Sequence, residues 1–127
     1  MPPRTVAAPP PPEICTDQQP DIVFFDFDSD LPTGGASQTI DFVAGNAERC
    51  GWNSYRVVGH TDRAGSNLYN GGLSMRRAQA IADLMVGKGI ECGAMTITAE
   101  GETNPRVPTA DGIRSPENRR VEITVSK

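Results

Sequence analysis

A strand pattern, a polar turn and a helical repeat follow one another between residues 55 and 85, and this stretch constrains the fold most. The run Tyr-Arg-Val-Val at 55–58 is β-branched and aromatic, as in a buried strand. Beyond the turn, apolar side chains recur at the spacing of a helix that begins near Leu73. Asp62 follows the strand and Arg77 lies one turn into the helix. The pattern therefore predicts an acid and a base on rigid neighbouring elements, where small α/β domains often bind ligands.

Chain length and charge limit the class of protein. The 127 residues suffice for one domain with a modest core. The net charge is −4, and no run of Lys and Arg is long enough to follow a phosphate backbone, so we expect no nucleic-acid partner. No apolar run approaches the roughly 20 residues that a membrane-spanning helix needs.

The N-terminal segment is rich in proline. Residues 1–19 are predicted to form an extended, semi-rigid linker of polyproline II type, and residues 20–127 the folded domain. A ligand for a proline-reading module is the alternative interpretation of the linker. Because a tether needs something at its other end, we expect a membrane anchor in an N-terminal part beyond this sequence.

The remaining segments alternate between strand and helix patterns. Strands are predicted at 21–27, 54–59, 95–99 and 119–125, and helices at about 36–47 and 73–87, the second capped by Ser74 or a neighbour. Between the last two strands, residues 101–116 form a long polar loop, which is typical of a functional or compactly packed excursion. The order β-α-β-α-β-loop-β predicts an α+β two-layer sandwich, in which two main helices cover a mixed four-stranded sheet.

A catalytic site is poorly supported by the residues present. His60 and Asp62 form an H-x-D pair, and Ser66 and Ser74 supply nearby hydroxyls. A Ser/His/Asp triad needs the histidine between nucleophile and acid in space, whereas His60 is more typical of a structural turn residue here. Zinc would need three further ligands around this single histidine, and none has a suitable spacing.

Asp62 and Arg77 together suit a ligand that carries both charges. A carboxylate accepts an ammonium group, and an arginine holds a carboxylate through two parallel N–H donors. Free backbone N–H groups at the start of the second helix favour the same anion. These groups predict a pocket for a zwitterionic amino-acid head. The residues leave one alternative equally open, that Asp62 and Arg77 only pair with each other.

Several ordered motifs resemble the OmpA-like peptidoglycan-binding domain. They are Gly-His-Thr-Asp-Arg-Ala-Gly-Ser at 59–66, Tyr-Asn at 69–70, Leu-Ser-x-x-Arg-Ala at 73–78, Gly-Glu at 101–102 with Pro105, and Asn-Arg-Arg-Val-Glu-Ile at 118–123. The resemblance covers about residues 21–127. That family includes the periplasmic domain of outer-membrane protein A, the peptidoglycan-associated lipoprotein and the flagellar stator protein MotB.

The resemblance implies a ligand, the diaminopimelate residue of the peptidoglycan stem peptide, whose side chain ends in a free amino-acid head. By position, Asp62 would bind its ammonium group and Arg77 its carboxylate. Family positions that line the pocket or lie near it are occupied by Phe27, Asp28, Asn70, Leu73 and Arg119. The family needs neither a metal nor a cofactor, and peptidoglycan is the expected partner.

The three cysteines are too far apart for a metal motif, so the residues alone leave both a disulfide and three free thiols open. In the predicted layout, Cys15 precedes the first strand and Cys50 follows the first helix, at the same end of the sheet. We therefore predict a Cys15–Cys50 disulfide that ties the end of the linker to the domain, with Cys92 as the unpaired thiol. A disulfide implies an oxidising compartment.

The resemblance as a whole implies a non-catalytic, non-covalent anchor in the periplasm of a Gram-negative bacterium. It would hold the outer membrane to the cell wall. A stator-type anchor of an inner-membrane protein is the alternative within the family. A cell-wall hydrolase is the alternative from a different class, and it would require a nucleophile or a metal. The sequence predicts neither the affinity nor the oligomeric state.

Overall fold

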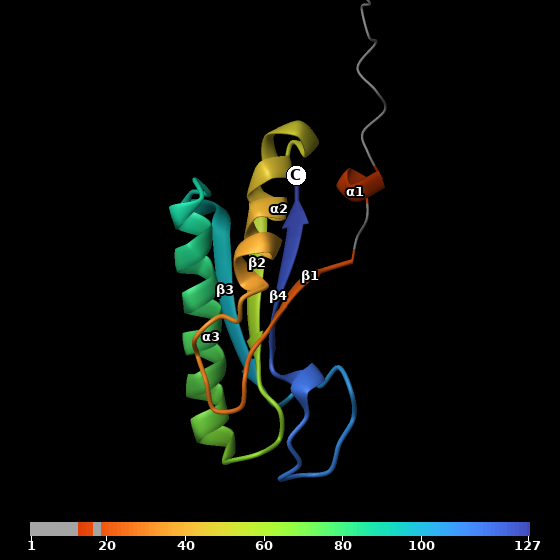
Figure 1. The fold of residues 1–127 in the computed structure, drawn as a ribbon, viewed down its shortest axis with the longest axis vertical. Helices are drawn as coiled ribbons and strands as arrows, with labels where there is room; N and C mark the ends of the chain where they lie inside the picture. Colours follow the sequence, from red (N-terminus) through yellow and green to blue (C-terminus); the bar gives the residue numbers. More distant parts are fainter. Residues whose placement is uncertain (1–12, 17–18) are drawn as a thin grey trace, which may run out of the picture.

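The computed structural model describes residues 13–16 and 19–127, so most of the predicted polyproline linker lies outside the described residues. The elements, shown in Figure 1, are α1 (Glu13–Thr16), β1 (Asp21–Phe24), α2 (Ala36–Cys50), β2 (Ser54–His60), α3 (Asn67–Gly87), β3 (Met95–Gly101) and β4 (Arg120–Ser126). Short 3-10 turns precede β3 and β4. Among the described residues, no helix is long and apolar enough to cross a membrane.

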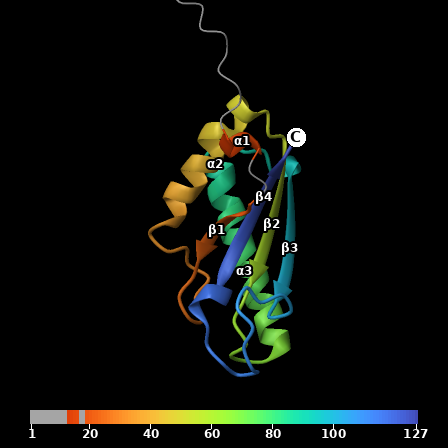
Figure 2. The ribbon, with the colours of Figure 1, turned by 90° about the vertical axis from the view of Figure 1, so that its right-hand side faces the viewer.

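The four strands form one mixed sheet in the order β1-β4-β2-β3. β4 runs antiparallel to both β1 and β2, whereas β2 and β3 are parallel and are joined through α3. Both long helices cover one face of the sheet, so the domain has two layers when viewed from the side (Figure 2). The predicted α+β two-layer sandwich is confirmed.

The core lies between the helices and the sheet. Alternate strand residues such as Val23, Val57 and Ile123 point into it, and Ile40 and Ile81 meet them from the two helices. Burial of these side chains supplies the main stabilisation of the sandwich. Close packing of β2 on α3 depends on one glycine.

That glycine is Gly59, near the end of β2. A Cβ atom at Gly59 would lie 1.9 Å from the backbone oxygen of Ser74 in α3. The absence of a side chain therefore brings the strand exit directly against the helix that carries Arg77.

Three predicted boundaries are wrong by three residues or more. α2 ends at Cys50 rather than at about residue 47. β1 ends at Phe24 rather than at residue 27, because the chain turns at Asp28, which has a left-handed φ of 54°. α3 begins at Asn67 rather than near Leu73, and its cap is Ser66, whose hydroxyl accepts a hydrogen bond from the Tyr69 N–H (3.2 Å). The pair of glycines at 71–72 favours a loop in sequence, but packing keeps it helical.

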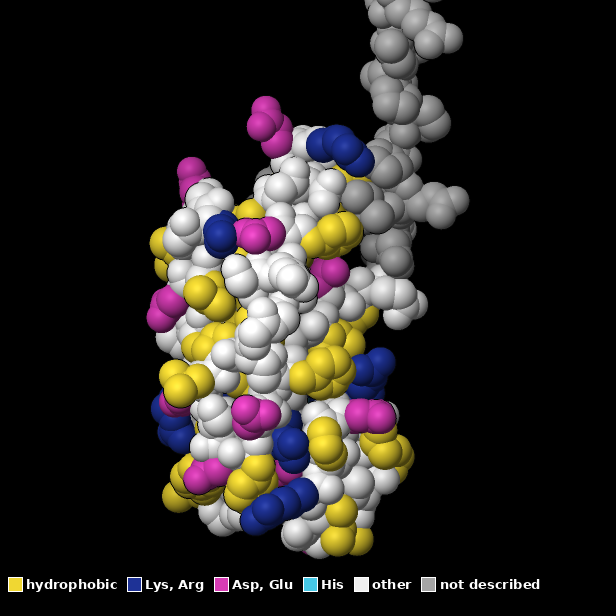
Figure 3. All heavy atoms as spheres, viewed as in Figure 1, with side chains coloured by type: hydrophobic (Ala, Val, Ile, Leu, Met, Phe, Trp, Pro, Cys, Tyr) yellow, Lys and Arg dark blue, Asp and Glu magenta, His cyan; other side chains and the backbone are white. Residues whose placement is uncertain are grey.

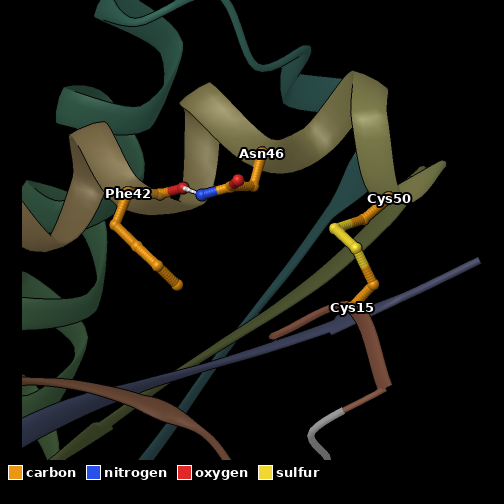
Figure 4. The surroundings of a disulfide bond; sticks show 4 residues. All are labelled: Cys15, Phe42, Asn46 and Cys50. Atoms are coloured by element: carbon orange, nitrogen blue, oxygen red, sulfur yellow. Dashed lines mark hydrogen bonds between the residues drawn. A yellow bond between two sulfur atoms is a disulfide. The ribbon is translucent and has the colours of Figure 1, made fainter. Parts of the chain in front are cut away.

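The Cys15–Cys50 disulfide is confirmed, with a Cα–Cα distance of 5.1 Å. Figure 4 shows the bond between the short α1 segment and the last turn of α2. Cys92 is a free, exposed thiol, as predicted. The disulfide lies at the end of the sheet where β2 begins, and the turn between β2 and α3 lies at the opposite end (Figure 1).

Candidate functional site

A pocket of about 320 Å³ opens at the exit of β2, between the β2–α3 turn and the loop that follows β1. Six of the seven predicted site residues line it, and the lining also includes three residues that were not predicted: Phe27, Asp28, Asp62, Asn70, Leu73 and Arg77, together with Ala64, Gly65 and Tyr69. In Figure 3, Lys and Arg side chains gather toward the lower end of the molecule, where this turn lies.

Arg77 is fully buried and is held by the backbone. Its guanidinium donates three hydrogen bonds to carbonyl oxygens, at 2.8 Å to Ser29, 3.1 Å to His60 and 3.1 Å to Asp26. It also lies 5.3 Å from the ring centroid of Phe25. A guanidinium has five N–H groups, so two remain for a ligand.

Burial lowers the pKa of Arg77 to about 10, although the nearby Asp62 carboxylate acts in the opposite direction. A pKa of this size still leaves the side chain protonated at neutral pH. Arg77 is therefore a fixed positive charge in the wall of the pocket. Its three bonds join the loop after β1 to the end of β2.

The Asp62 carboxylate is also held in place. One oxygen accepts from the Ala64 N–H (3.2 Å), and the other accepts from the Ser115 N–H (3.1 Å) and from Arg119 Nη1 (3.2 Å). Asp62 is only 3% exposed. The alternative that Asp62 and Arg77 form an exclusive pair is not what the structure shows, because Asp62 pairs with Arg119 and Arg77 binds carbonyl groups. Arg119, the seventh predicted residue, thus contacts the site through Asp62 and does not line the pocket.

Asp28 is the more accessible acid of the pocket. It is exposed at the turn after β1, and its carboxylate accepts a hydrogen bond from the Tyr69 hydroxyl. This bond raises the pKa of Tyr69 above its ordinary value. Tyr69 was missed as a site residue, although its place in the first turn of a longer α3 would have indicated it.

Asn70 has a structural part in the pocket. Its amide group donates to the backbone oxygen of Ala64 (3.0 Å) and to the Glu102 carboxylate (3.2 Å). Glu102 in turn accepts from Arg63 (3.1 Å), which also pairs with Asp111. These bonds join the β2–α3 turn to the loop after β3.

The H-x-D pair does not form one site. His60 is 2% exposed and lies between Glu100 and Glu122, with a 3.7 Å contact to each, and it does not line the pocket. Ser66 caps α3, and Ser74 is buried between the Gly71 carbonyl and the Gly101 N–H. Among the described residues, no group of His, Cys, Asp and Glu is arranged to hold a metal ion.

The pocket therefore presents one buried cation and two carboxylates to a ligand. This arrangement suits a small molecule that carries an ammonium group and a carboxylate together. Residues 24–119 match the model of the family described as the OmpA family. The chain belongs to the OmpA family.

Relatives and solved structures agree with this assignment. The chain is 36% identical over 108 residues to an outer membrane protein of Gluconacetobacter diazotrophicus, covering 80% of this chain and 29% of that protein. The same fold occurs in the peptidoglycan-associated lipoprotein of Burkholderia pseudomallei, with a TM-score of 0.75, 23% identity, and coverage of 84% of this chain and 90% of that one. The C-terminal domain of Helicobacter pylori MotB gives a TM-score of 0.70, 23% identity, and coverage of 85% and 84%.

Proposed function

We propose that this OmpA-family domain binds peptidoglycan without catalysis, through the free amino-acid head of a diaminopimelate residue in the stem peptide. The observation that carries the proposal is the pocket itself, in which the buried Arg77 faces the same space as the carboxylates of Asp28 and Asp62. Burying a charged group is costly unless it forms hydrogen bonds or ion pairs. Arg77 forms three such bonds and keeps two N–H groups unbonded within the described residues, so these two are available to a ligand. The neighbour from Burkholderia pseudomallei is a peptidoglycan-associated lipoprotein, which supports peptidoglycan as the partner.

Each charge of the ligand has a proposed partner. The carboxylate of the head binds the two remaining N–H groups of Arg77, which are oriented by the three carbonyl contacts. The ammonium group binds Asp62, and Asp28 contributes as a second acceptor because Asp62 already receives three hydrogen bonds. Phe27 and Leu73 contact the methylene chain behind the head.

We further propose that the domain anchors the outer membrane to the cell wall in the periplasm. The names of the curated relatives support an outer-membrane protein, and this chain spans 29% of the length of the Gluconacetobacter relative. The disulfide lies at the end of the sheet opposite the pocket, so an anchor attached at that end would leave the pocket free to reach the wall. The MotB neighbour favours a second candidate, a stator-type anchor of an inner-membrane protein.

A sedimentation assay with purified diaminopimelate-type sacculi tests the proposal. We expect wild-type protein to pellet with the sacculi, and Asp62→Ala and Arg77→Ala to remain in the supernatant. Arg76→Ala is the matched control, since Arg76 is the exposed neighbour of Arg77 and pairs with Asp30 at 3.3 Å. Release of soluble fragments from the sacculi by wild-type protein would instead indicate a hydrolase.

Because Arg77 supports the fold, its loss can act through unfolding as well as through binding. Circular dichroism of each variant separates the two effects. Asp62→Asn keeps the size of the side chain and removes only its charge, so it is expected to bind poorly while folded. Retention of Asp62→Asn and folded Arg77→Ala on sacculi would overturn the assigned roles.

A further inference from the structure

Arg114 stacks on one residue of the pocket wall. Its guanidinium carbon is 3.7 Å from the centroid of the Phe27 ring, and Phe27 is one of the residues that line the pocket. Both side chains belong to exposed residues. Arg114 therefore contacts the wall of the pocket and is open to solvent.

On both sides of Arg114 the backbone is bonded to the turn between β2 and α3. Directly after it, the Ser115 N–H donates to the Asp62 carboxylate (3.1 Å). Two residues before it, the Gly112 N–H donates to the carbonyl of Arg63 (2.8 Å). These two bonds hold the loop against the turn between β2 and α3, so the position of Arg114 does not depend on the ring contact alone.

Like the buried Arg77, and unlike the other arginines near the pocket, Arg114 has no acidic partner within the described residues. Arg63 pairs with Glu102 and Asp111, and Arg76 pairs with Asp30. Arg119 pairs with Asp62. A guanidinium stacked on an aromatic ring keeps its N–H groups available for a carboxylate.

We propose that Arg114 is a second anion-binding residue of this pocket, which contacts a carboxylate in the peptide that carries the zwitterionic head. This inference rests on the proposed function. When the zwitterionic head lies between Arg77 and the carboxylates of Asp28 and Asp62, the rest of the peptide extends past Phe27 and contacts Arg114. The ligand class is therefore an acidic peptide, and Arg114 favours it over the same peptide with its carboxylates amidated.

Two tripeptides test this preference. Both are L-Ala-γ-D-Glu-meso-diaminopimelate with an intact side-chain head; in one the two remaining carboxylates of the peptide are free, and in the other both are amidated. We expect wild-type protein to bind the free acid about two- to fivefold more tightly at low salt, as for one exposed ion pair. Peptides amidated at one position only identify which carboxylate Arg114 contacts.

Arg114→Gln should reduce the ratio of the two dissociation constants to about one, and Arg114→Lys, which keeps the charge, should retain part of it. Arg106→Gln is the matched control. Arg106 lies in the same loop and stacks on Phe24 at 5.7 Å, but Phe24 does not line the pocket. Arg106→Gln removes one positive charge, as Arg114→Gln does, and we expect it to leave the ratio of the two dissociation constants at its wild-type value.

The outcomes separate this inference from the proposed function. Equal ratios in wild type and Arg114→Gln, with both peptides bound, would overturn the role of Arg114 and leave the proposed function standing. Binding of neither tripeptide by wild-type protein would overturn both. A wild-type preference that shrinks at high salt supports the ion pair, because screening weakens exposed charges.

Discussion

Two pockets of similar size lie at opposite ends of the sheet, and they differ in where their charges are placed. The pocket at the exit of β2 measures about 320 Å³ and the one at the start of β2 about 360 Å³. In the first, Arg77 and Asp62 are buried and are bonded to backbone groups of other segments. In the second, the charged side chains of Glu48 and Glu91 are exposed around a floor that includes Trp52.

Pocket size alone therefore does not distinguish the proposed binding site from the other pocket. Exposed charges at a rim cost the fold little, whereas a buried charge must be compensated by bonds. The exit pocket compensates Arg77 with three carbonyls and Asp62 with two N–H groups and one arginine. The start pocket belongs to the end of the domain that the Cys15–Cys50 disulfide ties together. One end therefore buries charges that are bonded within the fold, and the other is cross-linked by a disulfide.

The largest expected effect is that of Arg77→Ala on stability. The substitution removes the donor that Arg77 supplies to three carbonyl groups in two segments, the loop after β1 and the end of β2, and opens a space beneath the pocket. We expect the free energy of unfolding to fall by about 3–5 kcal/mol in urea denaturation. Arg76→Ala, an exposed change one residue away, should alter it by about 0.5 kcal/mol or less. A loss below about 1 kcal/mol for Arg77→Ala would show that its burial is not structurally important.

Removal of the disulfide tests the other end. Cys15→Ser with Cys50→Ser should lower the free energy of unfolding by about 2–4 kcal/mol, because the bond closes a long loop in the unfolded chain. Binding to sacculi should remain within about twofold of wild type for the folded protein. Cys92→Ser serves as the control in the same denaturation series. Lost binding in the folded double variant would show that the two ends are coupled.

His60 predicts a pH dependence of stability. Burial, with a smaller contribution from Arg120, lowers the pKa of His60 below 6.5 in the folded state. Since the unfolded chain then binds the proton more readily, stability falls as the pH drops below 6.5 and is fully present above it. The difference in unfolding free energy between wild type and His60→Gln should therefore shrink from pH 7 to pH 5. A difference that grows over this range would contradict the lowered pKa.

The smallest effect is expected from single acids at the two pockets. Asp28→Asn should weaken binding to diaminopimelate by about fivefold or less, because Asp28 is exposed and screened by water. Asparagine tolerates the left-handed φ of this position, so the fold should be unaffected. Glu48→Gln at the other pocket should leave the dissociation constant unchanged in isothermal titration. Equal effects of the two variants would remove the distinction between the pockets.

Much of this arrangement follows from local sequence patterns. The order of strands and helices follows from apolar periodicity, and the exit of β2 follows from the polar run after Val58. The disulfide was predictable because the ends of two predicted elements placed Cys15 and Cys50 together. The start of α3 was not, because the glycines at 71–72 oppose a helix that tertiary packing enforces.

The bonding partners within the site could not be predicted. Side-chain types indicated Asp62 and Arg77, but their partners come from segments distant in sequence. Arg77 binds carbonyl groups, which every residue has and no sequence pattern marks. The pairing of Asp62 with Arg119 depends on the path of the loop before β4, which has no periodic signal. Arg114 over Phe27 is a contact of the same kind.

The most direct test of the central claim is a titration of ¹⁵N-labelled protein with meso-diaminopimelate, followed by amide chemical shifts. We expect the shifts to concentrate around Asp28, Asp62 and Tyr69 at the exit pocket. The indole N–H of Trp52, the only tryptophan of the chain, should report no change at the other end. Shifts centred on Trp52, or no shifts at saturating ligand, would contradict the claim that the buried charges mark the binding site.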